Sequence, residues 1–405
     1  MKILWVKTDF LHPTNRGGQI RTLEMLRRLH ARHEVHYVAY HDPEDGEGLA
    51  RAPEYASRVV PVNTPIPERG SWAFWKQLAA NLVSPLPLAV GRYQSDAMKQ
   101  TIAGLVNTEN YDALVCDFLS SAPNMPDMSK AVLFQHNVES MIWQRHAEHA
   151  PDLLRRVYFK SQAARMLRCE RKFCRAAAGV IAVSEQDAGV FRQRFGVEHV
   201  TAVPTGVDTD YFEAPGHSES TGDIVFCGAM DWLPNVDGIG WFSTEVLPII
   251  RKRRPACRVT LAGRSPAPEV KALASDPQIR VTGTVADIRP FLWGSEIALV
   301  PLRIGGGTRL KIYEAMAAGV PVVSTTVGAE GLDVTHGRDI LLADTAETFA
   351  EACLLLLESA EARQRIAGAA LELVRTRFSW EKVTQRFEGI LQAAYAPSHA
   401  GPGAR

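Results

Sequence analysis

Short apolar runs of strand length alternate along this chain with stretches of helix length that carry apolar residues on one face. This alternation is typical of parallel β-sheets covered by helices. In the first half, the predicted strands are 3–6, 35–39, 113–116, 132–135 and 180–183. In the second half, they are 223–227, 258–262, 279–282, 297–301 and 320–324. The pattern therefore predicts an α/β protein with two doubly wound, Rossmann-like domains.

A segment rich in Pro, Gly, Ser and Asp separates the two series of strands. It reads PTGVDTDYFEAPGHSESTGD and has the composition of a linker. We place an N-terminal domain at 1–212 and a C-terminal domain at 213–378. The remaining pattern predicts a final helix at 379–395 and a frayed tail at 396–405.

Composition narrows the class of protein. The chain is 46% hydrophobic and 22% charged, as expected for a globular protein of two or three domains, and its 45 basic residues balance 45 acidic ones. No overall field therefore favours nucleic acid. Six cysteines without a C-x-x-C pair fit a reducing compartment, and Lys7 and Asp9 interrupt the first apolar run, which argues against a signal peptide. We therefore expect a cytoplasmic protein.

The segment RIGGGTRLKIYEAMAAGVPVVS is the main candidate for chemistry. It predicts a strand end, a glycine loop and a helix that starts near Thr308, and such a helix start offers free N–H groups to phosphate. Lys311 adds a positive charge, and Glu314 follows on the same helix face. A carboxylate there could accept hydrogen bonds from two ribose hydroxyls. The alternative is a solvated surface pair beside a structural turn.

Several further segments extend the pattern in chain order: GGQIRTLEMLRRL, FQHNVES, FCGAMDWLPNVDGIGWF, VTLAGRSP and VTGTVADIRPFL. Together they resemble the retaining glycosyltransferases of family 4, and especially sugar transferases of bacterial exopolysaccharide assembly. The resemblance implies the GT-B architecture of two facing Rossmann-like domains. The N-terminal domain would then face the acceptor, the C-terminal domain would bind the nucleotide-sugar donor, and the final helix would cross back to the N-terminal domain.

The resemblance also implies roles for individual residues. Glu314 would bind the ribose, Lys311 the diphosphate, and His136 would lie near the reacting sugar, so the implied catalytic residues are His136, Lys311 and Glu314. The implied donor-binding residues are Gly17, Gly18, Gly228, Gly263, Arg264, Gly283, Thr284, Val285, Gly305, Gly306, Gly307, Thr308, Arg309, Lys311 and Glu314. The family context implies a UDP- or GDP-linked hexose as donor, with neither a metal nor another cofactor.

The sequence departs from the family pattern in places. Gly306 stands where relatives often carry an acid that contacts the transferred sugar, and Thr205 stands where Asn is usual. Asp231 and Asn235 occupy the loop in which many relatives place an Arg and a Lys. A catalytically silent nucleotide-binding subunit therefore stays open as an alternative, as does a sugar-nucleotide epimerase of the same fold. The D-x-D pattern at 208–210 more simply predicts a turn than a metal site.

The predicted acceptor is a saccharide or a lipid-linked saccharide. The helical stretch 153–177 carries eight cations opposed only by Glu170, and the segment 68–93 adds a cluster of aromatic residues. A basic amphipathic helix near aromatic side chains can bind the inner face of an anionic membrane. The alternative is a solvated helix whose cations bind nothing in particular.

Overall fold

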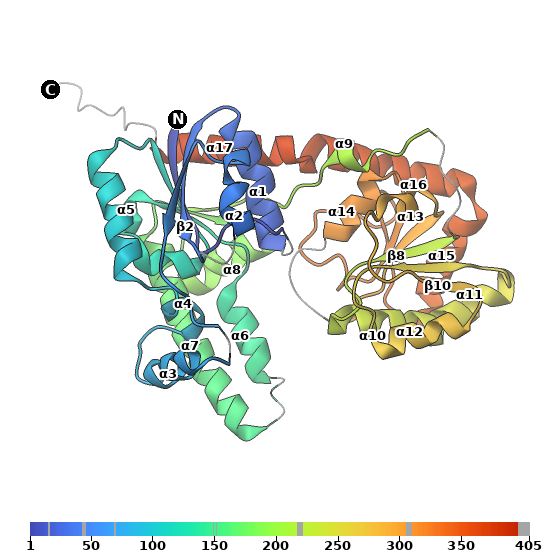
Figure 1. Ribbon diagram of the computed structural model, residues 1–405. Helices are drawn as coiled ribbons and strands as arrows, with labels where there is room; N and C mark the ends of the chain where they lie inside the picture. Colours follow the sequence, from blue (N-terminus) through green and yellow to red (C-terminus); the bar gives the residue numbers. More distant parts are fainter. Residues whose placement is uncertain are drawn as a thin grey trace. The chain divides into compact units, whose positions relative to one another are not determined.

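The computed structural model describes residues 1–14, 17–42, 46–68, 70–148, 150, 152–216, 222–304 and 310–395. It forms two compact units, each built around one parallel sheet (Figure 1). Unit 1 comprises Met1–Pro204 and Thr384–Arg405, and unit 2 comprises Thr205–Val383. The prediction of two doubly wound α/β domains is confirmed.

The sheet of unit 1 has the strand order β3-β2-β1-β4-β5-β6-β7, and every neighbouring pair is parallel. Its strands are β1 (Lys2–Val6), β2 (Glu34–Tyr40), β3 (Arg58–Val62), β4 (Ala113–Asp117), β5 (Val132–Phe134), β6 (Gly179–Ala182) and β7 (Val200–Ala202). Its helices are α1 (Gly17–His30), α2 (Gly46–Ala50), α3 (Trp72–Asn81), α4 (Leu88–Gly91), α5 (Asp96–Thr108), α6 (Glu139–Glu148), α7 (Leu153–Ala176) and α8 (Glu185–Phe195). The apolar pattern did not predict β3 or β7.

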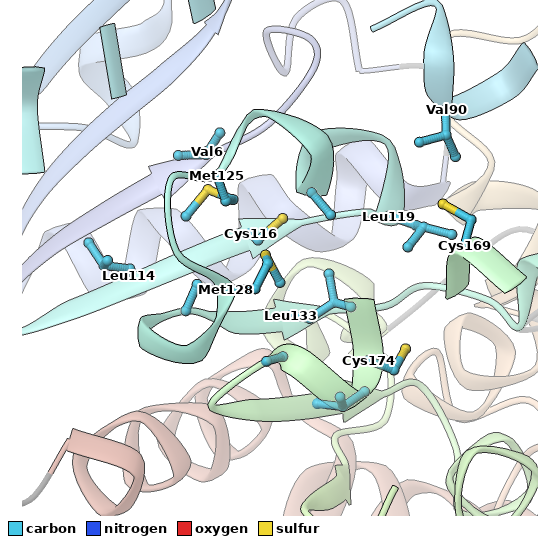
Figure 2. Packing of buried hydrophobic residues seen from close by; sticks show 14 of the residues in the cluster. Val6, Val90, Leu114, Cys116, Leu119, Met125, Met128, Leu133, Cys169 and Cys174 are labelled. Atoms are coloured by element: carbon cyan, nitrogen blue, oxygen red, sulfur yellow. The ribbon is translucent and has the colours of Figure 1, made fainter. Parts of the chain in front are cut away.

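Both faces of this sheet are buried, which explains why its central strand is almost wholly apolar. Alternate residues of β1 point to opposite faces. Leu4 and Val6 belong to the apolar cluster of which Figure 2 shows a part. Trp5 packs instead against Phe134 and Phe387. Phe387 belongs to α17 (Trp380–Tyr395). The second half of α17 therefore completes the core of unit 1.

The sheet of unit 2 has the order β10-β9-β8-β11-β12-β13 and is also parallel. Its strands are β8 (Ile224–Cys227), β9 (Val259–Ala262), β10 (Ile279–Val281), β11 (Ile297–Val300), β12 (Val322–Ser324) and β13 (Leu341–Leu342). Its helices are α9 (Thr209–Phe212), α10 (Leu233–Trp241), α11 (Leu247–Arg253), α12 (Pro268–Ala272), α13 (Arg289–Trp293), α14 (Leu310–Ala317), α15 (Ala346–Glu358) and α16 (Ala360–Leu373). Asp208 of the D-x-D pattern caps α9 by accepting a hydrogen bond from the Tyr211 N–H at 2.9 Å.

Strand order reverses once in each sheet, between β1 and β4 in unit 1 and between β8 and β11 in unit 2. The connections leave in opposite directions at such a point, so a crevice forms beyond the carboxyl ends of those strands, where ligands bind. None of the helices in the described ranges combines the length and the apolar character that a membrane crossing requires.

Candidate functional site

Two glycines bring the ends of β8 and β9 into close contact in unit 2. A Cβ atom on Gly263 would lie 1.7 Å from the carbonyl oxygen of Gly228, and one on Gly228 would lie 2.7 Å from Lys311 Nζ. The first contact is with backbone, which cannot move aside alone. Gly263 therefore stands where no side chain fits, and a side chain on Gly228 would displace the Lys311 ammonium.

Gly263→Ala tests this close approach. We expect the variant to lose about 1–3 kcal/mol of unfolding free energy, the usual effect of overpacking, because the ends of β8 and β9 must separate. Urea unfolding measures the loss. The control is Gly240→Ala in α10, where a Cβ meets nothing within 4 Å and stability should hold or rise. Equal stability of the two variants would contradict this account.

Lys311 is held in place at the start of α14. Its Nζ donates a hydrogen bond to Asn235 Oδ1 at 3.0 Å and lies 4.2 Å from the centre of the Phe226 ring. Asn235 is buried and in turn donates to the carbonyl of Ala229 at 2.6 Å. Asn235 and the Phe226 ring thus position the ammonium beside the Gly228 turn.

Glu314 lies one turn further along α14 and is partly buried. Burial raises its pKa to about 6, and the Lys311 charge opposes part of that rise. Burial, with a smaller contribution from the Glu314 charge, likewise raises the pKa of the Cys227 thiol to about 12. These mutual effects on pKa show that the Glu314 carboxylate lies near Lys311 and near Cys227 at the end of β8. Its role as a ribose ligand stays a prediction.

The other predicted donor residues lie on neighbouring loops of unit 2. Gly283 has a φ of +67°, in the left-handed region that glycine favours, and it begins the Gly283–Thr284–Val285 loop after β10. The Arg264 side chain is exposed, while its carbonyl accepts a hydrogen bond from Met230 N at 2.9 Å. Gly305, Gly306, Gly307, Thr308 and Arg309 lie outside the described residues.

In unit 1, Asp117 at the end of β4 is the centre of a buried polar cluster. Its Oδ1 lies 2.7 Å from His136 Nε2 and 3.1 Å from Lys7 Nζ. Its Oδ2 accepts hydrogen bonds from Thr22 Oγ1 at 2.7 Å and from Trp5 Nε1 at 3.0 Å. Burial alone would raise the Asp117 pKa, but Lys7, His136 and Thr22 together hold it well below its ordinary value. The carboxylate is therefore charged in the folded protein.

His136 occupies the strand end predicted from the FQHNVES segment. Its ring stacks on Phe118 with centroids 4.0 Å apart and planes 5° apart. Burial lowers the His136 pKa to about 4, although Asp117 opposes the shift, and the charges of Lys7 and Arg21 lower it further. Lys7 already balances Asp117, so a second positive charge in this buried space would be unfavourable. His136 is neutral at physiological pH.

This lowered pKa gives unfolding a defined pH dependence. The unfolded chain binds a proton at His136 below about pH 6.5, which the folded protein does not bind until about pH 4, so the associated stability is present above pH 6.5 and declines below it. Between pH 7.5 and pH 5.0 we expect the wild type to lose about 2 kcal/mol more than His136→Gln in urea unfolding. The control is His146→Gln, at an exposed position on α6, which should follow the wild type. Parallel pH curves for wild type and His136→Gln would contradict the assignment.

The sequence did not single out Asp117 or Lys7. Lys7 directly follows β1, and Asp117 is the last residue of β4. Only the parallel order of β1, β4 and β5 shows that their side chains meet. Glu170 was also missed, since it was treated as one charge on a basic helix. It accepts hydrogen bonds from the N–H groups of Glu139 at 2.8 Å and Ser140 at 3.1 Å, and it thereby caps α6 directly after the His136 loop.

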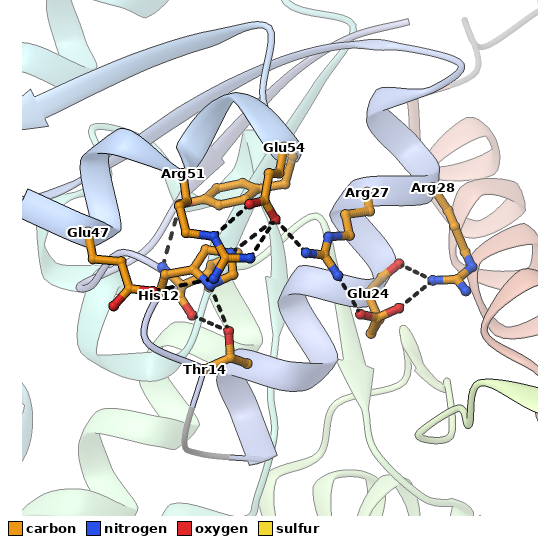
Figure 3. Close-up of polar contacts among 10 residues, drawn as sticks. His12, Thr14, Glu24, Arg27, Arg28, Glu47, Arg51 and Glu54 are labelled. Carbon is orange, nitrogen blue, oxygen red and sulfur yellow. Dashed lines mark hydrogen bonds and ion pairs between the residues drawn. The ribbon is translucent and has the colours of Figure 1, made fainter. Parts of the chain in front are cut away.

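The glycine loop after β1 lies beside this cluster. A Cβ on Gly18 would approach the Phe118 ring to 2.8 Å, whereas one on Gly17 would meet nothing within 4 Å. A polar network fixes the start of the connection (Figure 3). In it, His12 Nδ1 lies 3.1 Å from Thr14 Oγ1, and His12 Nε2 lies 3.3 Å from Glu54 Oε2. Of the two predicted glycines, only Gly18 is required by its surroundings.

A cavity of about 210 Å³ opens beside the cluster, within unit 1. One group of lining residues is polar: Lys7, Thr8, Asp9, Gln19, Ser120 and Glu139. Another is apolar or aromatic: Ala89, Val90, Tyr93, Phe118, Leu119 and Met166. Lys7 Nζ makes its ion-pair contact with Asp117 without hydrogen-bond geometry, so its N–H groups have no acceptor among the described residues. The lining suits a small ligand that has both hydroxyl groups and an apolar face.

Two family models match the chain and together cover most of it. The model described as Glycosyltransferase Family 4 matches residues 15–211, and the model described as Glycosyl transferases group 1 matches residues 221–359. The first model covers the strands that carry Asp117 and His136. The second covers Gly228, Gly263, Lys311 and Glu314.

One sequence relative and two solved structures are also similar to this chain over nearly its whole length. A Klebsiella pneumoniae protein, described as an uncharacterized 44.6 kDa protein in the cps region, is 21% identical over 94% of this chain and 97% of its own. The structure of Anabaena HepE in complex with UDP matches with a TM-score of 0.67 and 15% identity over 97% of this chain and 100% of that one. Sucrose-phosphate synthase from Thermosynechococcus elongatus matches with a TM-score of 0.69 and 17% identity over 98% and 99%. At these identities the structures show a shared fold.

Proposed function

The chain belongs to glycosyltransferase family 4, a family of retaining enzymes that use nucleotide sugars, and from that premise we propose that it transfers a hexose to a saccharide or lipid-linked acceptor in bacterial surface-polysaccharide assembly. The observation that carries the proposal is the convergence of Gly228, Gly263, Lys311 and Glu314 at the carboxyl ends of β8 and β9 in unit 2. This group combines close backbone approach, a fixed positive charge and a carboxylate. A nucleoside diphosphate has groups that match them: its phosphates suit the positive charge, and its ribose hydroxyls suit the carboxylate.

Lys311 would act on the leaving group. Negative charge grows on the diphosphate as the bond to the sugar breaks, and a cation fixed beside it in advance stabilises the transition state more than the ground state. Asn235 would hold the ammonium in position through its 3.0 Å hydrogen bond. Because the configuration at the sugar is retained, the incoming hydroxyl would attack from the face that the diphosphate leaves and pass its proton to a leaving-group oxygen.

His136 would position the transferred sugar and would not act as a base in this proposal. Its Nε2 contacts Asp117, and a pKa of about 4 leaves the ring a weak proton acceptor at neutral pH. The cavity lined by Phe118, on which His136 stacks, would hold a sugar ring, with hydroxyl groups toward Lys7 and Asp9 and the apolar ring face toward Phe118 or Tyr93. The cps region of the Klebsiella relative supports polysaccharide assembly as the context, and UDP bound to HepE supports a UDP-linked donor.

Calorimetric titration of UDP, GDP, ADP and their common sugar conjugates tests the donor site. We expect one nucleotide to bind selectively and Glu314→Ala to bind it about 10-fold to 100-fold more weakly, because hydrogen bonds to a charged carboxylate are lost. Wild-type affinity for the nucleotide-sugar conjugate, in which both phosphates are esterified and do not titrate near pH 6, should also fall as the pH drops below about 6, where Glu314 takes up a proton, whereas Glu314→Gln should show no such step. The control is Glu351→Ala, at an exposed position on α15.

The outcomes separate the open alternatives. A folded protein that binds none of these nucleotides would show that the Lys311–Glu314 group is structural, and the transferase proposal would fail. Selective binding with no transfer to any acceptor would favour the silent subunit. Conversion of the bound sugar to its epimer without an acceptor would favour the epimerase.

A further inference from the structure

Helix α3 directs an apolar face outward. Trp72 and Trp75 are 73% and 54% exposed, and the positions 72, 75, 76 and 79 follow one side of the helix at i, i+3, i+4 and i+7. Val83, two residues beyond the end of α3, is 91% exposed. The other side of the helix is fixed by polar contacts to α7. Asn81 Oδ1 accepts a hydrogen bond from Gln162 Nε2 at 3.1 Å, and the Leu82 carbonyl accepts one from Arg165 at 2.8 Å. A helix anchored in this way presents its apolar side chains to whatever lies outside the protein.

The start of α7 has the same character. Within the described part of unit 1, the exposed large apolar side chains lie only on two stretches, α3 with the two residues that follow it and the first turns of α7. We call this set the docking face: Trp72, Trp75, Leu82, Val83, Leu153, Leu154 and Val157. α6 and α7 project from the sheet of unit 1, and α3 lies beside α7 (Figure 1). Clustering of exposed apolar groups on one projection marks an interaction site.

Cations accompany the docking face. Lys76 lies 5.5 Å from the centre of the Trp72 ring, and Arg155, Arg156 and Lys160 are exposed on the first turns of α7. Acidic side chains on the adjacent described segments are few: Glu68, Glu148 and Asp152, of which Asp152 pairs with Arg155. The one acid within α7, Glu170, is buried as the cap of α6. The charge on the outer side of α7 is therefore strongly positive.

We propose that the docking face binds the surface of a membrane that contains anionic phospholipids. Tryptophan and leucine side chains enter the boundary between headgroups and acyl chains, while nearby lysine and arginine residues pair with lipid phosphates. The juxtaposition of Trp72 and Trp75 with four exposed cations favours such a surface over an uncharged protein partner. Docking through one face of this kind is peripheral and reversible.

The docking face also borders the candidate acceptor side. α4, which follows α3, supplies Ala89 and Val90 to the cavity wall, and α7 supplies Met166. Docking would thus place a membrane-borne acceptor near the cavity, a consequence that rests on the proposed function. Membrane binding itself does not rest on it, so the two can fail separately.

Sedimentation of the full chain with vesicles tests the proposal. We expect binding to vesicles of phosphatidylglycerol and phosphatidylcholine at 50 mM salt, at least tenfold weaker binding to pure phosphatidylcholine, and weakening at 500 mM salt. One variant, Trp72→Ser with Trp75→Ser, removes apolar contact, and another, Arg155→Gln with Arg156→Gln and Lys160→Gln, removes charge. Each should lower the partition coefficient at least tenfold.

Two control variants in unit 2 make the same kinds of substitution, one apolar and one charged, outside the docking face. Leu355→Ser removes an exposed leucine, and Lys252→Gln with Lys271→Gln and Lys382→Gln removes three exposed charges, so both should bind vesicles like the wild type. A cooperative thermal transition like that of the wild type confirms that each variant is folded, and the charge variant keeps the test valid if the tryptophan variant does not fold. No binding to anionic vesicles, or equal binding by docking-face variants and controls, would overturn the proposal. Self-association of the wild type without lipid that both docking-face variants abolish would also overturn it, because the face would then join two copies.

Discussion

Lys311→Met is expected to lower kcat/KM for transfer by about 10²–10³-fold, the usual effect of removing one preorganised donor to a developing negative charge. The substitution keeps an unbranched side chain of nearly the same length but removes the ammonium, which lies over the Phe226 ring and which Asn235 holds beside Gly228. Both a rise in KM and a fall in kcat are expected, because the diphosphate is charged in the ground state and more so in the transition state. Initial-rate measurements over a range of donor concentrations separate the two.

Lys271→Met is the matched control for this prediction. Lys271 is exposed on α12 of the same unit, so the same change of residue type there should leave kcat/KM within about twofold of the wild type. The thermal transition of both variants establishes that they are folded. If Lys311→Met kept a kcat/KM within threefold of the wild type, diphosphate stabilisation by Lys311 would be wrong even if nucleotide binding persisted.

Asp117→Asn is expected to lower the free energy of unfolding by about 3–5 kcal/mol, because removing one partner of a buried ion pair leaves the other charge uncompensated. The change keeps the shape of the side chain, so the loss would report charge and not a cavity. Lys7 would be left buried beside a neutral amide, and His136 would lose the carboxylate that contacts its Nε2. Urea unfolding at pH 7 measures the effect.

Two further variants sharpen this test. Asp96→Asn changes an exposed carboxylate at the start of α5, and at most about 1 kcal/mol should be lost there. Adding Lys7→Met to Asp117→Asn removes the stranded charge and should recover part of the loss, since paired residues are not additive. A double variant no more stable than Asp117→Asn alone would show that the hydrogen bonds from Thr22 and Trp5 dominate the cluster.

Local sequence patterns were enough to predict the fold class and most strands of unit 2. Fully apolar runs of strand length such as residues 3–6 are typical of strands buried on both faces, and that pattern is local. The strands β3, β7 and β13 were not predicted, because β3 lies at the edge of its sheet with Pro61 in it, and β7 and β13 are edge strands of only three and two residues. Whether such segments form strands depends on pairing with an adjacent strand and not on their own sequence pattern.

The order of motifs also brought Gly228, Gly263, Lys311 and Glu314 together as candidates, because loops at the same ends of parallel strands must lie near one another. Which atoms come into contact became clear only from the folded chain. Asp117 joins Lys7 and His136 through the pairing of β1, β4 and β5, across separations in sequence that no local pattern records. The direction that the α3 tryptophans face was likewise undetermined, because an apolar helix side looks the same in sequence whether it packs inward or is exposed.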